Sequence, residues 1–226
     1  MPTIRDPLWN NIPLDTVAER LLDTAVVQRL RYVRQLGLAH LVYPGATHSR
    51  FEHALGAYHL ARTTLGILRE SGSLEGRASD ERAVSAAAAL LHDVGQYPFS
   101  HALEEIGVTH QEELSRPLVT EGAIADTLRR ELGDDAPARV YSLICGTSAS
   151  ALQRLISGSI DLDKVDYLKR DALMCGVTYG ESDEARLIPP PDVPADPTTG
   201  RRPPDRGDIG LIVDWLRVAP AELLLP

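Results

Sequence analysis

At residues 90–101 the sequence reads LLHDVGQYPFSH. The apolar run Ala83–Leu91 leads directly into the adjacent pair His92 and Asp93, and Gly95 follows where a helix would end. Neighbouring side chains on a helix point about 100° apart, so this pair can converge on one ion only where the helix frays. An imidazole beside a carboxylate suits a borderline or hard divalent cation. A lone His-Asp pair is more often a solvated surface pair, so the metal-binding interpretation depends on what surrounds it.

The composition limits the class of protein. The chain has 226 residues, of which 43% are hydrophobic, and a net charge of −9 from 23 basic and 32 acidic residues. The apolar fraction suffices for a sizeable core. The acidic balance argues against a nucleic-acid partner. It does not exclude a small anionic substrate, because a local basic pocket can exist on an acidic protein.

The cysteines and the apolar runs indicate the compartment. Cys145 and Cys175 match no metal-binding spacing, and free thiols are typical of a reducing cytoplasm. The first ten residues are polar and contain prolines, unlike a secretory leader. The longest uncharged apolar run, Ala83–Leu91, is too short to span a bilayer. We therefore expect a cytoplasmic protein with no membrane partner.

A second histidine stands in the first turn of an expected helix. Ser49 and Glu52 have the form of a capping box, and the helix that they begin should run to about Glu70. His53 shares a face of this helix with small and apolar residues. Such a histidine is usually a satisfied core residue. The small neighbours would also let another helix approach closely enough to share an ion, so both interpretations stay open.

Helical patterns cover much of the remaining chain. Residues 1–13 look irregular, and Leu41–Tyr43 resembles a strand. Further helices are expected over residues 16–22, 24–36, 80–93, 121–132, 136–145, 149–157 and 164–173, with another containing His110 after a cap at Thr109. The helix over 164–173 should line a wet cavity or the surface, because one face carries the polar residues Asp163, Tyr167, Arg170 and Asp171.

The composition changes after Ile188. Residues 189–206 hold seven prolines and no apolar periodicity, which is typical of a linker or a disordered excursion. Residues 209–213 could form one strand, and a helical pattern begins at Ala219. The apolar leucines at the end of the chain suggest a sequence that is cut short.

Several blocks of sequence, in the right order, resemble the HD-domain phosphohydrolases. Within that family they are most similar to the deoxynucleoside triphosphate triphosphohydrolases. The resemblance covers residue 4 to about residue 188. The blocks are Asp23–Thr24, Gln28–Tyr32, Arg34–Gly37, Tyr43–Ala46, Phe51–His53, His92–His101, Ile160–Tyr167 and Arg170–Asp171.

The resemblance implies an all-α fold, a helical bundle around a metal ion with a small irregular or strand-containing C-terminal extension. The domain organisation that we expect is an HD phosphohydrolase domain over 1–188 and a Pro-rich linker or loop over 189–208. The start of a truncated C-terminal region would follow over 209–226.

The resemblance also implies roles for individual residues. One divalent ion (Mn, Mg, Fe, Ni or Zn) would be bound by His53, His92, Asp93 and Asp163. Phosphate groups would lie against Arg50, His101 and Lys164. The sugar would lie against Gln35, Tyr167 and Asp171. Proton transfer would fall to His110 and Glu104, with Gln96 at a position where the family has a histidine.

The implied reaction is metal-assisted hydrolysis of a deoxynucleoside triphosphate to the deoxynucleoside and inorganic triphosphate. One alternative is an HD phosphohydrolase that acts on another nucleotide phosphate ester. The other is a nucleotide-binding regulatory module without turnover, which the glutamine at position 96 would favour. The expected partners are the nucleotide and further copies of the chain in a homo-oligomer.

Overall fold

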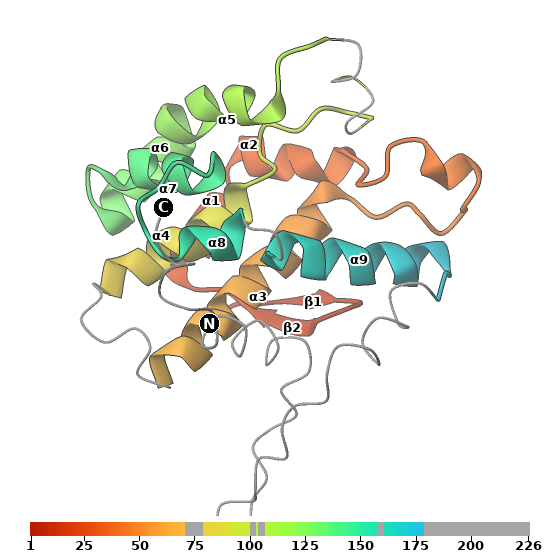
Figure 1. Cartoon of the computed structure of the whole chain (residues 1–226), viewed down its shortest axis with the longest axis horizontal. Coiled ribbons are helices and arrows are strands. Elements are labelled where there is room, and N and C mark those ends of the chain that lie inside the picture. The colour runs from red at the N-terminus through yellow and green to blue at the C-terminus, as the bar shows by residue number, and fades with distance from the viewer. Residues whose placement is uncertain (71–78, 100–102, 104–106, 158–160, 179–226) are drawn as a thin grey trace, which may run out of the picture.

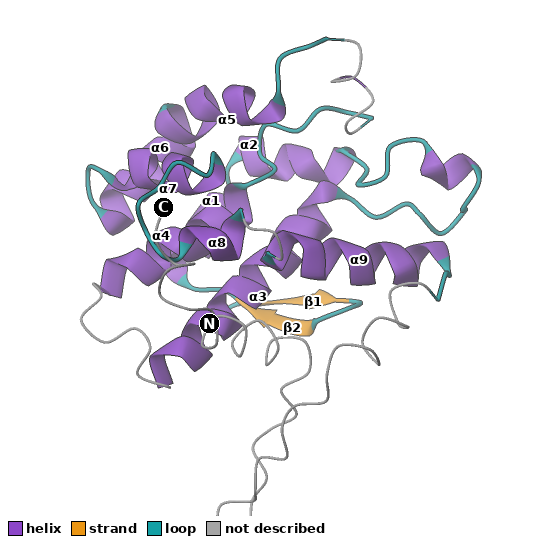
Figure 2. Cartoon of the chain, viewed as in Figure 1, coloured by secondary structure: helices purple, strands orange, loops and turns teal. Residues whose placement is uncertain are grey.

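The longest helix, α3 (Arg50–Glu70), packs against α4 and α9, and most of the other helices lie on the α4 side of it (Figure 1). The computed structural model describes residues 1–70, 79–99, 103, 107–157 and 161–178. In these residues the protein is mostly helical, with a small two-stranded sheet at the N-terminus (Figure 2). The expectation of an all-α fold is confirmed in this sense. The other helices are α1 (Thr16–Leu22), α2 (Ala25–Gln28), α4 (Ser79–Leu91), α5 (Gln111–Thr120), α6 (Gly122–Leu132), α7 (Ala136–Ile144), α8 (Gln153–Ile156) and α9 (Leu162–Cys175), with 3₁₀ turns at Arg29–Tyr32 and Ala39–Leu41.

The alanine-rich helix α4 is at the centre of the hydrophobic core. Every residue from Val84 to Leu91 is buried, because α3, α7, α1, α6 and α8 pack around it. A helix that is apolar on all sides gains stability only when it is enclosed in this way. The alanines let the neighbouring helices approach closely. The helix ends at Leu91, two residues before the expected end at Asp93, so His92 and Asp93 follow in a turn at the edge of the core.

The first thirteen residues form a hairpin, and the expectation of an irregular segment was wrong. Strand β1 (Thr3–Asp6) pairs antiparallel with β2 (Asn10–Pro13), with Asp6 opposite Asn10. The carboxylate of Asp6 accepts hydrogen bonds from the backbone N–H groups of Leu8 and Trp9, which closes the turn. Each strand has four residues. The alternating apolar and polar pattern of each strand is therefore too short to be distinguished from the turn residues beside it.

The helix expected over 24–36 is interrupted. Thr24 is the N-cap of α2, but the helical hydrogen bonding continues only through a 3₁₀ turn to Tyr32. Beyond it the chain is extended, because Val33 O accepts from Arg50 N at 2.8 Å and Gln35 N donates to His48 O at 3.0 Å. The strand expected at Leu41–Tyr43 was also wrong, since a 3₁₀ turn covers Ala39–Leu41.

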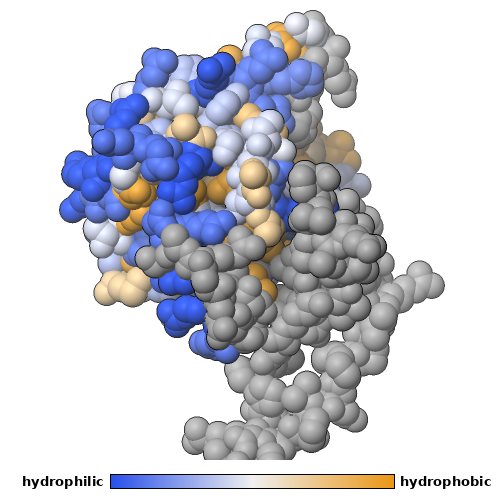
Figure 3. Space-filling model, turned by 60° about the vertical axis from the view of Figure 1, so that its left-hand side comes forward, coloured by the Kyte–Doolittle hydropathy of each residue, from blue (hydrophilic) through white to orange (hydrophobic). Residues whose placement is uncertain are grey.

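The ends of several later helices differ from the expected ones. The helix expected to contain His110 begins one residue later, at Gln111, with His110 at the N-cap position. The helix expected over 149–157 is confined to α8. The Pro-rich segment 189–208 and the region 209–226 lie outside the described residues. Of the described helices, none is long and apolar enough to cross a membrane. On the face drawn in Figure 3, hydrophilic residues cover most of the coloured surface.

Arg170 does not share the wet face that the sequence predicts for its helix. Its side chain is 1% exposed and donates to both oxygens of Asp166, each at 2.9 Å. It also donates to Asp6 Oδ2 at 2.9 Å, which joins α9 to the hairpin. Trp9 Nε1 donates to Asp166 Oδ1 at 2.5 Å. The hairpin is therefore fixed to α9 by a buried ionic network that local periodicity could not predict.

We expect the substitution Arg170→Met to destabilise the fold by about 3–5 kcal/mol, because it leaves Asp6 and Asp166 buried without their counter-charge. Urea unfolding followed by circular dichroism measures the loss. Arg130→Met is the matched control, since the Arg130 side chain is 58% exposed and pairs with the neighbouring Glu131. Equal stability of the two variants would contradict a supporting role for the Arg170 network.

Candidate active site

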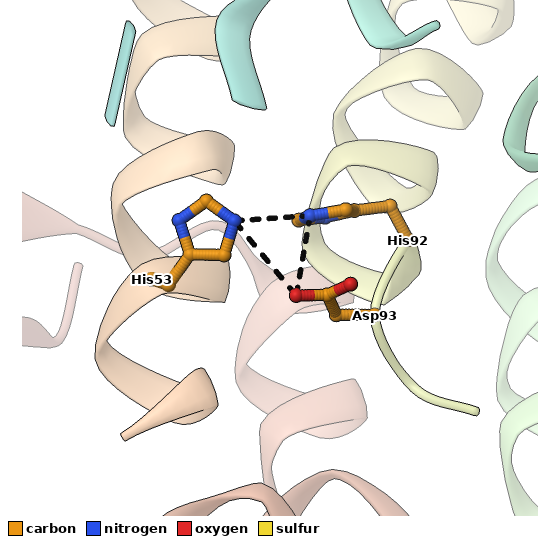
Figure 4. A group of neighbouring side chains, drawn as sticks. All are labelled: His53, His92 and Asp93. Atoms are coloured by element: carbon orange, nitrogen blue, oxygen red, sulfur yellow. Dashed lines mark hydrogen bonds and ion pairs between the residues drawn. The ribbon is translucent and has the colours of Figure 1, made fainter. Parts of the chain in front are cut away.

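The four predicted metal ligands lie together where three helices meet. His53 is in the first turn of α3, His92 and Asp93 follow the last turn of α4, and Asp163 is in the first turn of α9. His53 Nε2 lies 3.1 Å from His92 Nε2 and 2.8 Å from Asp163 Oδ1. Asp93 Oδ2 lies 3.8 Å from His53 Nε2 and 3.6 Å from His92 Nε2 (Figure 4). His53, His92 and Asp93 each offer a ligand atom within 4.8 Å of the other two, near enough to share one ion, and Asp163 lies beside the two histidines.

The outer ring nitrogens determine which atoms face the centre of the cluster. His53 Nδ1 lies 2.8 Å from Asp166 Oδ2, and His92 Nδ1 lies 2.8 Å from the carbonyl oxygen of Ala89. Because each Nδ1 faces an acceptor, each would keep its proton when a metal ion is bound, and the Nε2 lone pair would then be directed inward. The two Nε2 atoms lie 3.1 Å apart, so both could contact one bound ion.

The charges around the cluster strongly favour a cation. Burial lowers the pKa of His53, but hydrogen bonds to Asp163 and Asp166 raise it to about 10. Burial raises the pKa of Asp93, but His92, Arg50 and His53 hold it below its usual value. The grouped donors are two imidazole nitrogens and the carboxylate of Asp93, with the predicted ligand Asp163 beside them, and this chemistry suits a divalent metal ion. The residues therefore fit the metal ion that the sequence predicts.

A cavity of about 510 Å³ opens beside the cluster, within the usual size range of small-molecule sites. It is lined by His92, Asp93 and Asp163 and by five of the six predicted substrate-binding residues, namely Gln35, Arg50, Lys164, Tyr167 and Asp171. Arg50 donates to Asp93 Oδ2 at 2.5 Å, and Lys164 Nζ donates to Asp161 Oδ2 at 2.8 Å. The cavity thus joins the cluster to two cationic side chains.

The predicted proton-transfer residues are not gathered at this cavity. His110 is exposed at the start of α5 and does not line the cavity, although Gln111 and Glu112 next to it do. Gln96 is 1% exposed, is absent from the cavity wall, and has no partner for its side-chain amide among the described residues. Glu104 and His101 lie outside the described residues. The catalytic roles given to these four residues stay predictions.

Sequence reasoning missed three residues that support the site. Asp166 orients His53. Arg29 donates to the carbonyl oxygens of Val94 and Gln96, at 2.8 and 3.0 Å, and so holds the turn after Asp93. His48 is fully buried, and its Nε2 lies 2.8 Å from Asp171 Oδ1. Most of these contacts join residues that are far apart in the chain, so no local pattern indicates them.

Comparison with known proteins agrees with the fold and the cluster. The HD domain family matches residues 50–171, more than half of the 226 residues, so the chain belongs to the HD domain family. This membership supports a phosphohydrolase that binds a divalent metal ion. The chain is 35% identical over 189 residues to the uncharacterized protein YwfO of Bacillus subtilis, a match that covers 81% of this chain and 42% of YwfO.

Two further relatives have names that state an activity. The human deoxynucleoside triphosphate triphosphohydrolase SAMHD1 is 42% identical over 105 residues, which are 46% of this chain and 17% of the human protein. The crystal structure of a phosphohydrolase from Bacteroides thetaiotaomicron aligns with a TM-score of 0.67 and 31% identity, over 78% of this chain and 43% of that one. The chain spans less than half the length of each of these three relatives.

We expect His92→Ala and Asp166→Asn to weaken metal binding in different ways. His92→Ala removes a ligand, so bound metal should be lost almost completely after dialysis. Asp166→Asn removes the charge behind His53 and should lower metal affinity by about 10- to 100-fold. Titration with Mn²⁺, together with elemental analysis, measures both effects. Asp126→Asn, an exposed change on α6, is the control. Metal affinity that survives His92→Ala would rule out this cluster as the binding site.

Proposed function

We propose that the protein is a metal-dependent phosphohydrolase that converts deoxynucleoside triphosphates to the deoxynucleoside and inorganic triphosphate. The main support is the position of the predicted metal cluster, of which His92, Asp93 and Asp163 line a cavity that Arg50 and Lys164 also line. Cationic side chains beside a metal site suit an anionic phosphate ester. The similarity to SAMHD1 over 105 residues adds the triphosphate substrate class.

Different residues of the cavity would have different roles in the reaction. When bound, the metal ion would polarise a phosphate oxygen and activate water. Arg50 orients Asp93 and, with Lys164, opposes the negative charge of the phosphates. Lys164 is 39% exposed at its side chain, so its ammonium can reach a ligand in the cavity. Glu112 lines the same cavity and could accept a proton, whereas Asp161, which also lines it, is paired with Lys164.

One wall of the cavity is suited to a sugar. Gln35 is 7% exposed, and its Oε1 has no hydrogen-bond donor among the described residues. A buried amide oxygen without a donor is costly, and a ligand hydroxyl would satisfy it. Tyr167 and Asp171 line the same cavity from α9. His48 connects the wall, because its carbonyl oxygen accepts from Gln35 N and its ring bonds Asp171.

Two alternatives remain testable. An HD phosphohydrolase for another nucleotide phosphate ester would use the same metal cluster and the same cations, but would release a different product. A nucleotide-binding module without turnover is favoured by the glutamine at position 96, because a histidine at that position could titrate and glutamine cannot.

Product analysis distinguishes these possibilities. Incubation of the chain with each deoxynucleoside triphosphate and Mn²⁺ should release the deoxynucleoside and intact triphosphate, separated by ion-exchange chromatography. Asp163→Asn should reduce turnover at least about 100-fold, because a ligand is weakened, whereas the exposed change Asp126→Asn should have no effect. Release of monophosphate and pyrophosphate would support the first alternative, and binding without product would support the second.

The sugar wall makes a separate prediction. His48→Ala removes a buried hydrogen bond to a carboxylate, and such a bond contributes about 1.5–3 kcal/mol. We therefore expect kcat/KM for a deoxynucleoside triphosphate to fall by about 10- to 100-fold. Hydrolysis of bis-p-nitrophenyl phosphate, which has no sugar, should change little. Equal losses on both substrates would show that His48 acts on the whole site rather than on the sugar wall.

A further inference from the structure

A second cavity lies between α3 and α4, on residues that the candidate active site does not use. Its volume is about 310 Å³. The cationic residues in its wall are Arg62 and Arg69 from α3 and Arg82 from α4, and the acidic one is Asp15. We propose that this cavity binds a small anion that carries two or more phosphate groups. The proposal does not depend on the proposed function.

The cavity is well separated from the metal cluster. His53 is in the first turn of α3, whereas Arg69 is sixteen residues further along the same helix, about 24 Å away at 1.5 Å per residue. Arg82 lies ten residues before His92, or about 15 Å along the axis of α4. The two cavities share no lining residue. A ligand in the second cavity would therefore leave the active-site wall unobstructed.

The arginines are arranged on facing helical surfaces. Arg62 and Arg69 are seven residues apart, nearly two helical turns, so their side chains share a face of α3 about 10 Å apart along the axis. Arg82 reaches the same space from α4. The floor between them contains Gly66, Ala83 and Ala86, whose small side chains create the room. A Cβ built on Gly66 would meet no atom within 4 Å.

The charges of this wall are only partly neutralised. Asp15 accepts from Ala18 N and Tyr58 Oη, and its Oδ2 lies 3.6 Å from Arg62 Nε. Arg62 also donates to the carbonyl oxygen of Pro13 at 2.9 Å. Within the described part of the chain, Arg69 and Arg82 have no hydrogen bond or ion pair. Among the described residues, two guanidinium groups therefore lie beside a cavity without a counter-charge, on a chain whose net charge is −9.

The shape and charge of the cavity indicate the class of ligand. Guanidinium groups match the oxygen geometry of phosphate and can bind it with paired hydrogen bonds. Unpaired charges on two helices favour an anion with at least two negative charges. A cavity of 310 Å³ is larger than a monatomic anion requires. Inorganic triphosphate and the polyphosphate tail of a nucleotide share this chemistry. Leu65, Ala83 and Ala86 in the cavity wall have no polar side-chain atoms that could hydrogen-bond a nucleotide base.

Calorimetric titration of the full chain with inorganic triphosphate at low salt tests the proposal. We compare the wild type, the Arg69→Gln/Arg82→Gln double variant, and a control double variant, Arg129→Gln/Arg130→Gln, with the same change in charge. All three proteins also carry Lys164→Gln, which weakens triphosphate binding in the competing active-site cavity. The Arg69→Gln/Arg82→Gln variant loses two charge-assisted contacts and should bind triphosphate at least about tenfold more weakly, whereas the control should lose much less affinity. Equal losses in both double variants, or none in the first, would overturn the proposal.

A second measurement locates the ligand directly. Phenylglyoxal modifies accessible arginines, and mass spectrometry identifies each modified residue. Triphosphate should slow modification of Arg69 and Arg82 and leave Arg129 and Arg130 unchanged. The same protection by a deoxynucleoside triphosphate would identify nucleotides as a source of the anion, whereas protection by inorganic triphosphate alone would identify the free polyphosphate. Unchanged modification of Arg69 and Arg82 with both ligands would overturn the proposal.

Discussion

The rest of the structure depends on the hydrogen bonds that the buried carboxylate of Asp166 accepts. It is fully buried and accepts hydrogen bonds from His53, Trp9 and Arg170. Burial raises its pKa, but His53 and Arg170 lower the pKa to about 2. One carboxylate therefore connects the N-terminal hairpin, α3 and α9. It also orients an imidazole of the metal cluster, so stability and function depend on the same charge.

This arrangement limits the residues around it. Gly56 faces the Asp166 carboxylate, and a Cβ at this position would lie 1.7 Å from Oδ1. Any larger residue would displace the carboxylate of Asp166 or the guanidinium group of Arg170, or push α3 away from α9, because real Cβ contacts are essentially never so short. The close approach of these two helices brings His53 within 2.8 Å of Asp163. The geometry of the cluster therefore requires a glycine on α3 that carries no chemistry of its own.

The sequence predicted the features that depend on neighbouring residues. The apolar run before His92 predicted a buried helix that ends at the metal ligands, and Ser49 with Glu52 predicted the start of α3. Features that join distant residues were not predictable in this way. Arg170 was expected on a solvent-facing side of its helix, but it pairs with Asp6, 164 positions away, and is buried in an ionic network. The extended segment after Tyr32 likewise depends on Ser49 and Arg50 as partners, and not on its own helical periodicity.

An acidic chain can bind anionic ligands because charge acts locally. At physiological ionic strength the screening length is about 8 Å, so most of the 32 acidic residues have little effect inside a cavity. The candidate active site combines Arg50, Lys164 and the positive charge that its metal ligands favour. The cavity between α3 and α4 has arginines instead. The two sites occupy opposite ends of the same pair of helices, where the close packing of α4 in the core gives way to solvent and charged side chains can converge.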